Sequence, residues 1–155
     1  MTSRIAPLPH RHVLTLPTVP SAVRMVREAT EQVLAEWGIS PRHPAVDPAL
    51  LILSELVTNS VRHAAPVSPN LTVMYAAGRG TFVFAVHDRH PYQPVLDGLG
   101  TDAGPTVGTG TGTANGNGGL ATVMELTRSL DGTVVVHGDG DGGGKSICVS
   151  LPLQR

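Results

Sequence analysis

The hydrophobic pattern is strongest between residues 50 and 64, where LLILSELVTNSVRHA places apolar residues at helical spacing. With about 100° between successive residues, the polar positions share roughly a third of the helix circumference: Glu55, Asn59, Arg62 and His63. The other positions form a wide apolar arc: Leu50, Ile52, Leu53, Leu56, Val57, Val61 and Ala64. Little of this helix can therefore face water. A carboxylate and a carboxamide one turn apart on such a helix need a polar guest such as a metal ion, a phosphate or ordered water.

The pattern before this helix predicts one strand and one further helix. Residues 13–16, VLTL, are typical of a short strand, and residues 1–12 form a tail rich in proline, histidine and arginine. Residues 21–38 repeat apolar side chains at helical spacing, with Pro20 near the start and Gly38 as the stop. The central helix should begin with Asp47 as its N-cap and Pro48 at its first position.

After the central helix, the pattern changes to strands. Residues 71–77 and 81–88 predict a hairpin, and the second of these strands is apolar on both faces, which favours a central place in the sheet. The remaining predicted elements are a helix over 120–130 and strands over 133–138 and 146–153. This order predicts the α+β class: a two-layer sandwich in which about three helices cover one face of a mixed, mostly antiparallel sheet.

Composition places limits on the class of protein. A chain of 155 residues with 41% hydrophobic residues has the size of one globular domain. Its net charge of −1 gives no reason to expect nucleic acid or an anionic membrane as a partner. The N-terminus lacks the apolar core of a signal peptide, so we expect a cytoplasmic protein. Cys148 is the only cysteine, which excludes an internal disulfide, and its apolar surroundings suggest a small core residue.

Glycine is concentrated in one part of the chain. Fifteen of the eighteen glycines lie between Gly98 and Gly144, and residues 97–119 contain no lysine, arginine or large aromatic residue. Such a segment cannot form a packed core of its own. We therefore expect a single domain over residues 13–153, interrupted by one flexible glycine-rich loop at about 97–119.

Two glycine motifs resemble known phosphate-binding patterns without matching them fully. The segment ending in Gly144, Lys145 and Ser146 is no P-loop, because Asp139 occupies the position of the first glycine and a strand follows. The pattern that starts at Gly116 fits a dinucleotide-binding fingerprint, but no strand is predicted directly before it. A dinucleotide-binding oxidoreductase is therefore a minor alternative.

The same glycines are nevertheless suited to phosphate. Gly116, Gly118 and Gly119 would allow close backbone approach, and the first-turn amides of a helix starting at Leu120 would present its positive end. The pair Glu55 and Asn59 is suited to Mg²⁺, which takes one or two protein oxygens together with phosphate oxygens and water. The two features together indicate a Mg-nucleotide.

At this point the sequence resembles a known family. ELVTNSVRHA, Asp88 at the end of a hydrophobic strand with Pro94 six residues later, and a glycine-rich segment before a helix are similar to the Bergerat ATP-binding fold. Gyrase, Hsp90, histidine kinases and MutL share this fold. The resemblance covers roughly residues 13–151 and is strongest to the small single-domain anti-sigma factors and serine kinases of actinomycete bacteria.

The resemblance implies a role for each matched residue. Glu55 would be the general base and Asn59 the Mg²⁺ ligand, while Asp88 would accept a hydrogen bond from the adenine amino group. The phosphate-binding lid would contain the glycine-rich residues Gly116, Gly118, Gly119 and Leu120. Pro94 belongs to the second box, and Ser146 matches a hydroxyl that lies near the adenine-bound carboxylate in this family. This sequence departs from the family pattern at His90 and Tyr92, where glycines are usual, and at Asn117 in the lid.

The leading hypothesis is a regulatory protein that binds ATP and Mg²⁺. By resemblance, it would transfer the γ-phosphate to a serine or threonine of a small anti-sigma-factor antagonist, would also bind a sigma factor, and would form a homodimer. The alternative is a non-catalytic protein-binding module in which ATP is a structural ligand or has been lost.

Overall fold

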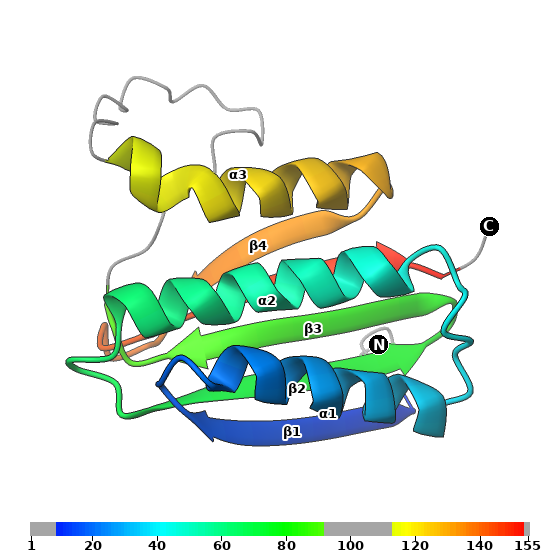
Figure 1. Cartoon of the computed structure of the whole chain (residues 1–155), viewed down its shortest axis with the longest axis horizontal. Coiled ribbons are helices and arrows are strands. Elements are labelled where there is room, and N and C mark those ends of the chain that lie inside the picture. The colour runs from blue at the N-terminus through cyan, green and yellow to red at the C-terminus, as the bar shows by residue number, and fades with distance from the viewer. Residues whose placement is uncertain (1–8, 92–112, 154–155) are drawn as a thin grey trace.

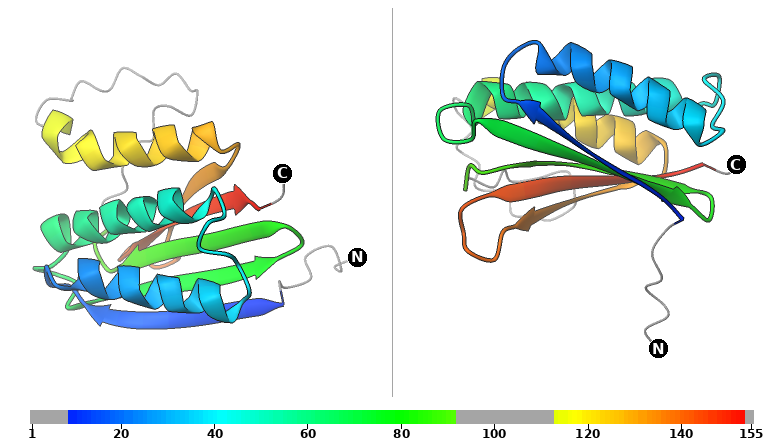
Figure 2. Two further views of the ribbon diagram at one scale, coloured as in Figure 1. Left: turned by 45° about the vertical axis from the view of Figure 1, so that its right-hand side comes forward. Right: turned by 90° about the horizontal axis from the view of Figure 1, so that it is seen from below.

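In the part of the chain that the structure describes, five strands form one antiparallel sheet, and three helices cover one of its faces (Figures 1 and 2). The computed structural model describes residues 9–91 and 113–153. The strands lie in the order β1-β2-β3-β5-β4, with bounds β1 (His10–Pro17), β2 (Asn70–Gly78), β3 (Thr81–Asp88), β4 (Thr133–Gly138) and β5 (Lys145–Pro152). The helices are α1 (Ala22–Glu36), α2 (Val46–His63) and α3 (Thr113–Ser129). The predicted two-layer α+β sandwich and the central place of β3 are confirmed.

The sheet is antiparallel at every pairing, whereas a mixed, mostly antiparallel sheet was predicted. The connections explain the difference. Two helices lie between β1 and β2, so the chain returns in the opposite direction. One helix lies between β3 and β4, which makes these strands parallel, but β5 is inserted between them and pairs antiparallel with both.

The core lies between the helices and the sheet. Its largest fully buried side chains come from all three helices and from strands β2, β3 and β5: Val26, Ile52, Leu53, Leu56, Val57, Leu71, Val73, Phe82, Phe84, Val123, Val149 and Leu151. Helix α2 lies between α1 and α3 (Figure 1), which explains its wide apolar arc. Cys148 alternates to the uncovered face of the sheet and is half-buried there, so its expected place in the core was wrong.

Two boundaries near the N-terminal half differ from the prediction. Strand β1 starts at His10, so residues 10–12 belong to the sheet rather than to the tail, and the ring of His10 stacks on Trp37. Helix α2 starts at Val46 with Ala45 as its N-cap, and Asp47 lies inside the first turn. The Ala45 N–H donates to His43 Nδ1 at 3.0 Å. The side chain that accepts a backbone hydrogen bond at the start of this helix is therefore His43 rather than Asp47.

The start of α3 is the largest difference. The helix begins at Thr113 rather than at Leu120, so Gly116, Gly118 and Gly119 lie inside it. Each glycine disfavours a helix by about 1 kcal/mol relative to alanine, which is why the sequence predicted a loop here. Gly119 packs directly against α2, where a Cβ atom would lie 2.5 Å from Glu55 Oε1. At Gly119, packing against α2 thus outweighs the weak helix propensity of glycine.

Candidate functional site

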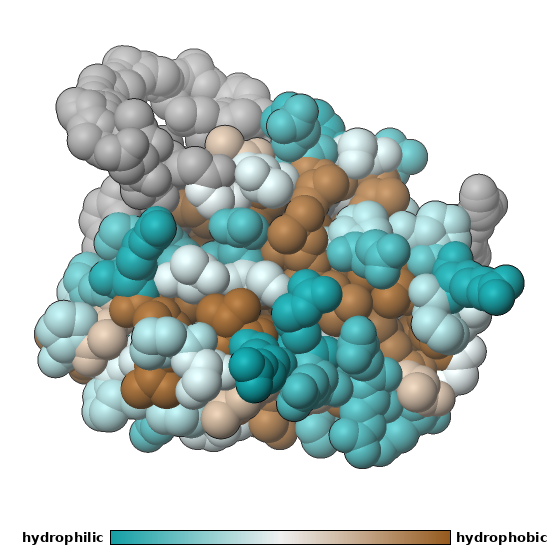
Figure 3. All heavy atoms as spheres, viewed as in Figure 1, coloured by the Kyte–Doolittle hydropathy of each residue, from teal (hydrophilic) through white to brown (hydrophobic). Residues whose placement is uncertain are grey.

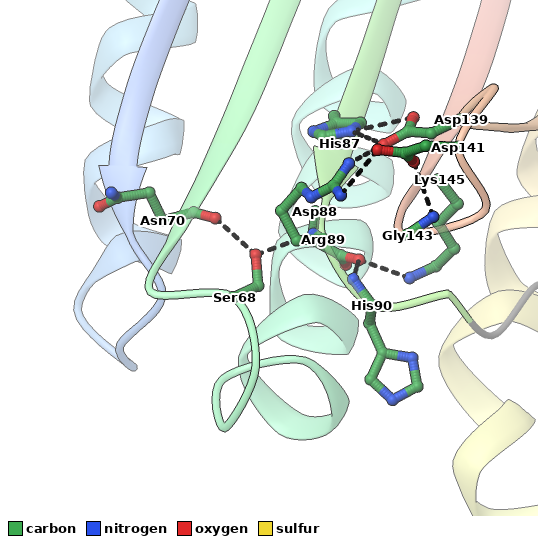
Figure 4. Close-up of polar contacts among 10 residues, drawn as sticks. All are labelled: Ser68, Asn70, His87, Asp88, Arg89, His90, Asp139, Asp141, Gly143 and Lys145. Carbon is green, nitrogen blue, oxygen red and sulfur yellow. Dashed lines mark hydrogen bonds and ion pairs between the residues drawn. The ribbon is translucent and has the colours of Figure 1, made fainter.

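Asp88 ends β3 and is almost fully buried, with 3% of its surface exposed. Its Oδ2 accepts a hydrogen bond from the Ser60 hydroxyl at 2.7 Å. Its Oδ1 accepts one from Lys145 Nζ at 2.7 Å and one from the His90 backbone N–H at 3.0 Å (Figure 4). The carboxylate is therefore fixed by α2, by β5 and by the chain that follows β3.

Lys145 reaches Asp88 because of strand alternation. Lys145 is the direct partner of Asp88 in the β3–β5 register, and it points to the helix-covered face like Ile147 and Val149. Only 5% of its surface is exposed, so Lys145 and Asp88 form a buried ion pair. Sequence reasoning gave Lys145 no role. The alternation of KSICVSLP carried the signal, because the lysine shares the phase of the buried apolar residues.

Ser146, which the resemblance placed near the adenine-bound carboxylate, lies elsewhere. It pairs with His87 in the register and therefore points to the uncovered face of the sheet, away from Asp88. The hydroxyl that contacts Asp88 belongs to Ser60 of α2 instead. Ser60 was also missed, although a hydroxyl within the apolar stripe that contains Leu56 and Val57 was visible in the sequence.

Glu55 and Asn59 are half-buried and lie one turn apart on α2. Neither side chain has a hydrogen bond or an ion pair with any residue in the described part of the chain. The Glu55 carboxylate lies against the backbone of Gly119, so the packing of α2 on α3 brings these two predicted residues together. Asn59 directly precedes Ser60, whose side chain contacts Asp88. Arg62 and His63 lie in the last turn of α2.

The other predicted lid residues are not gathered into a loop. Leu120 is a buried core residue, and the backbone of Gly116 and Gly118 is helical. The first turn of the helix is therefore not at Leu120, where phosphate was expected. Pro94 and the predicted lid residues 97–112 lie outside the described residues. Because Gly116 lies within a helix rather than directly after a strand, the structure also contradicts the dinucleotide-binding motif.

A second polar cluster ties the loop between β4 and β5 to the end of β3 (Figure 4). Asp139 accepts hydrogen bonds from His87 Nε2 at 2.9 Å and from Arg89 Nη1 at 2.5 Å. Arg89 Nη2 donates to Asp141 at 3.2 Å. The Gly143 N–H and, to a lesser extent, Arg89 hold the pKa of Asp141 below its usual range. These contacts fix the loop that leads into β5, and so they help to position Lys145.

The backbone after β3 is held by a further contact. The Arg89 N–H donates to Ser68 Oγ at 2.9 Å, and the Ser68 hydroxyl donates to the Asn70 carbonyl at 2.8 Å. Ser68 is fully buried.

In the described ranges, no three His, Cys, Asp or Glu side chains gather as a metal site. Likewise, none of the helices in those ranges has both the length and the hydrophobicity needed to span a bilayer.

The fold is an α+β sandwich with a buried, hydrogen-bonded carboxylate at the end of its central strand. Residues 46–155 match the family described as Histidine kinase-, DNA gyrase B-, and HSP90-like ATPase. This match covers most of the chain, and the chain belongs to that family. A comparison with curated proteins found no match.

The chain also aligns with solved structures. The crystal structure of the RsbU and RsbW domains of Rv1364c from Mycobacterium tuberculosis aligns with a TM-score of 0.63 and 22% identity over 94% of this chain. The aligned region is 33% of that longer chain. The histidine kinase domain of a blue-light activated histidine kinase from Erythrobacter litoralis EL346 aligns with a TM-score of 0.48 and 18% identity, over 70% of this chain and 44% of the other. The alignment to the first of these structures supports the fold assigned here.

Proposed function

We propose that this chain binds Mg-ATP and transfers the γ-phosphate to a serine or threonine of a small protein antagonist, and that it also binds a sigma factor. The observation that carries the proposal is the pair Glu55 and Asn59, half-buried on α2 without a partner among the described residues. Membership of the ATPase family supports ATP as the ligand. The choice of target rests on the resemblance of ELVTNSVRHA to the anti-sigma and serine kinase branch.

The residues present fit a Mg-nucleotide. Asn59 offers an amide oxygen, a hard ligand of the kind that Mg²⁺ prefers, and the rest of its shell would come from phosphate oxygens and water. When bound, Mg²⁺ would supply charge neutralisation for the phosphates. A carboxylate can accept roughly four hydrogen bonds. Asp88 accepts three from the described residues, so it can accept one more from an amine of the ligand.

Glu55 would act as the general base. Its carboxylate lies at the contact of α2 with α3, one turn before Asn59. A carboxylate with no ion-pair partner in the described part of the chain is free to accept the proton of an attacking serine or threonine hydroxyl. Asn59 and Asp88 would hold the nucleotide while Glu55 acts on the incoming hydroxyl, so binding and transfer depend on different residues.

The test is transfer of labelled γ-phosphate to candidate antagonists by the wild type and by Glu55→Gln. We expect transfer to fall by about two to four orders of magnitude, the usual contribution of a general base, while ATP affinity is retained. The matched control is Glu31→Gln, the same change at an exposed position of α1. Equal transfer by the wild type and Glu55→Gln would remove Glu55 from the mechanism.

A second candidate function is a protein-binding module without phosphoryl transfer. In its favour, hydrophobic surface is exposed on the helical side over α2 and between α2 and α3 (Figure 3), and Met25 and Leu51 are 38% and 41% exposed. Calorimetry separates the two functions. ATP binding without transfer to any antagonist would favour the module, and the absence of ATP binding would exclude the kinase.

A further inference from the structure

We propose that Lys145 and Asp88 act together as a reading pair for the adenine base. In this pair, Asp88 accepts a hydrogen bond from the exocyclic amine, and Lys145 donates one to the ring nitrogen N1 next to that amine. The inference rests on the proposed binding of ATP. It assigns to Lys145 a role in base specificity that neither the sequence motifs nor the family match assigns.

The first step is the hydrogen-bonding capacity of Asp88. Its Oδ1 already accepts from Lys145 Nζ and from the His90 N–H, whereas its Oδ2 accepts only from Ser60 among the described residues. A carboxylate has about two acceptor sites on each oxygen. The remaining site is therefore on Oδ2, and it can accept a single N–H donor.

The second step is the ammonium group of Lys145. It has three N–H donors, and in the described ranges Asp88 Oδ1 is its one acceptor. With 5% of the residue exposed, little water can reach the other donors. A buried donor without a partner is unfavourable. An acceptor supplied by a ligand at this position would satisfy it.

The third step is the match to the base. Asp88 offers a free acceptor and Lys145 a free donor, and the 2.7 Å contact between the two side chains keeps them adjacent. The Watson–Crick edge of adenine offers the complement, an amine donor beside the N1 acceptor, and pockets for a single base commonly read this edge. Guanine presents an acceptor at the position of the amine and a donor at N1. The pair should therefore favour adenine over guanine.

Lys145 is the only lysine in the chain, which gives a direct probe. Protein labelled only at the lysine side-chain nitrogen should show one ammonium signal in a magnetic resonance spectrum. We expect ATP to shift this signal strongly and 1-deaza-ATP, in which C–H replaces N1, to shift it much less. Equal shifts with both nucleotides would show that Lys145 does not contact N1.

Affinities of the wild-type protein provide the second measurement. We expect 1-deaza-ATP to bind at least about tenfold more weakly than ATP, because Lys145 loses its acceptor. The control 7-deaza-ATP, altered at a nitrogen that this pair does not read, should bind like ATP. Equal affinity for ATP and 1-deaza-ATP, or for ATP and GTP, would overturn the proposal. If the wild type binds no adenine nucleotide at all, the proposed function itself fails.

The variant Lys145→Met completes the test. It keeps the length of the side chain and removes the donor, so the preference for ATP over 1-deaza-ATP should fall to near unity. A role limited to neutralising Asp88 would leave that preference unchanged. Since the single variant leaves Asp88 unpaired, the comparison is repeated in the double variant Asp88→Asn/Lys145→Met, in which a neutral amide replaces the carboxylate. The wild-type measurements with modified nucleotides require no variant to fold.

Discussion

Lys145 Nζ lies 2.7 Å from Asp88 Oδ1, and both residues are buried beneath the helical layer. The pair joins the first residue of β5 to the last residue of β3. At the same end of the sheet, the Ser60 hydroxyl of α2 donates a hydrogen bond to Asp88. The same two side chains therefore hold elements of the fold together and form the base site proposed above.

The first prediction concerns stability. Lys145→Met alone should lower the free energy of unfolding by about 3–5 kcal/mol, because it leaves an uncompensated buried charge. The double variant Asp88→Asn/Lys145→Met should recover most of this loss, since no isolated charge remains. Urea unfolding followed by circular dichroism measures both. A double variant as unstable as the single variant would contradict the buried ion pair.

The second prediction concerns the metal. Asn59→Ala should weaken binding of Mg-ATP at least tenfold, about 1.4 kcal/mol, and should abolish the difference between ATP binding with Mg²⁺ and with a chelator. The neighbouring Thr58→Ala, also half-buried on α2, is the control and should behave like the wild type. Calorimetry under both conditions provides the measurement. An unchanged Mg²⁺ dependence in Asn59→Ala would exclude the residue as a ligand.

The third prediction concerns the contact of α2 with α3. In Gly119→Ala, the new Cβ would meet Glu55 Oε1, the mobile end of that side chain, so Glu55 should rotate away. The alanine should preserve or raise the stability by up to about 1 kcal/mol through helix propensity, while phosphoryl transfer falls. Ala121→Gly, at an exposed position of the same helix, should lower stability without affecting transfer. Full transfer activity in Gly119→Ala would show that the carboxylate need not stay beside this backbone.

The fourth prediction concerns pH. Burial raises the pKa of Tyr75 to about 12 from 10.0, although the hydrogen bond with Thr30 acts in the opposite direction. Between these values, the unfolded chain loses the phenolic proton and the folded chain keeps it, so the free energy of unfolding should decrease as pH rises. Tyr75→Phe should remove this contribution, as measured by urea unfolding at a series of alkaline pH values. The same slope in the wild type and in Tyr75→Phe would show that other groups cause it.

Much of the fold could be predicted from periodicity. The spacing of apolar residues, which must be buried, predicted three elements correctly. These are the strand β3 with two apolar faces, the helix before Gly38 and the helix α2 with its wide apolar arc. The helix start at Thr113 could not be predicted, because local glycine content disfavours a helix that packing against α2 stabilises. The N-cap of α2 was missed for a related reason: His43, which accepts the Ala45 N–H, is itself anchored to the distant Leu153 carbonyl.

The candidate site could be predicted only in part. Glu55 and Asn59 were predicted from helical spacing, and Asp88 from the family resemblance at the end of a strand. Their roles stay predictions. The ion-pair partner of Asp88, Lys145, depends on the β3–β5 register, which joins segments more than fifty residues apart. The family resemblance directed attention to the hydroxyl of Ser146, while the alternation of buried residues along β5 favoured Lys145.

The strict alternation along β5 has a consequence for how this site can change. Ile147, Val149 and Leu151 lock the strand in one phase against the core, and the residue that meets Asp88 is the one two positions before Ile147. If one residue were inserted between Lys145 and Ser146 while Ile147, Val149 and Leu151 kept their places in the core, the lysine would move into the turn before β5. The inserted residue would then lie opposite Asp88. The proposed base preference should therefore change with a change in chain length that removes none of the original side chains.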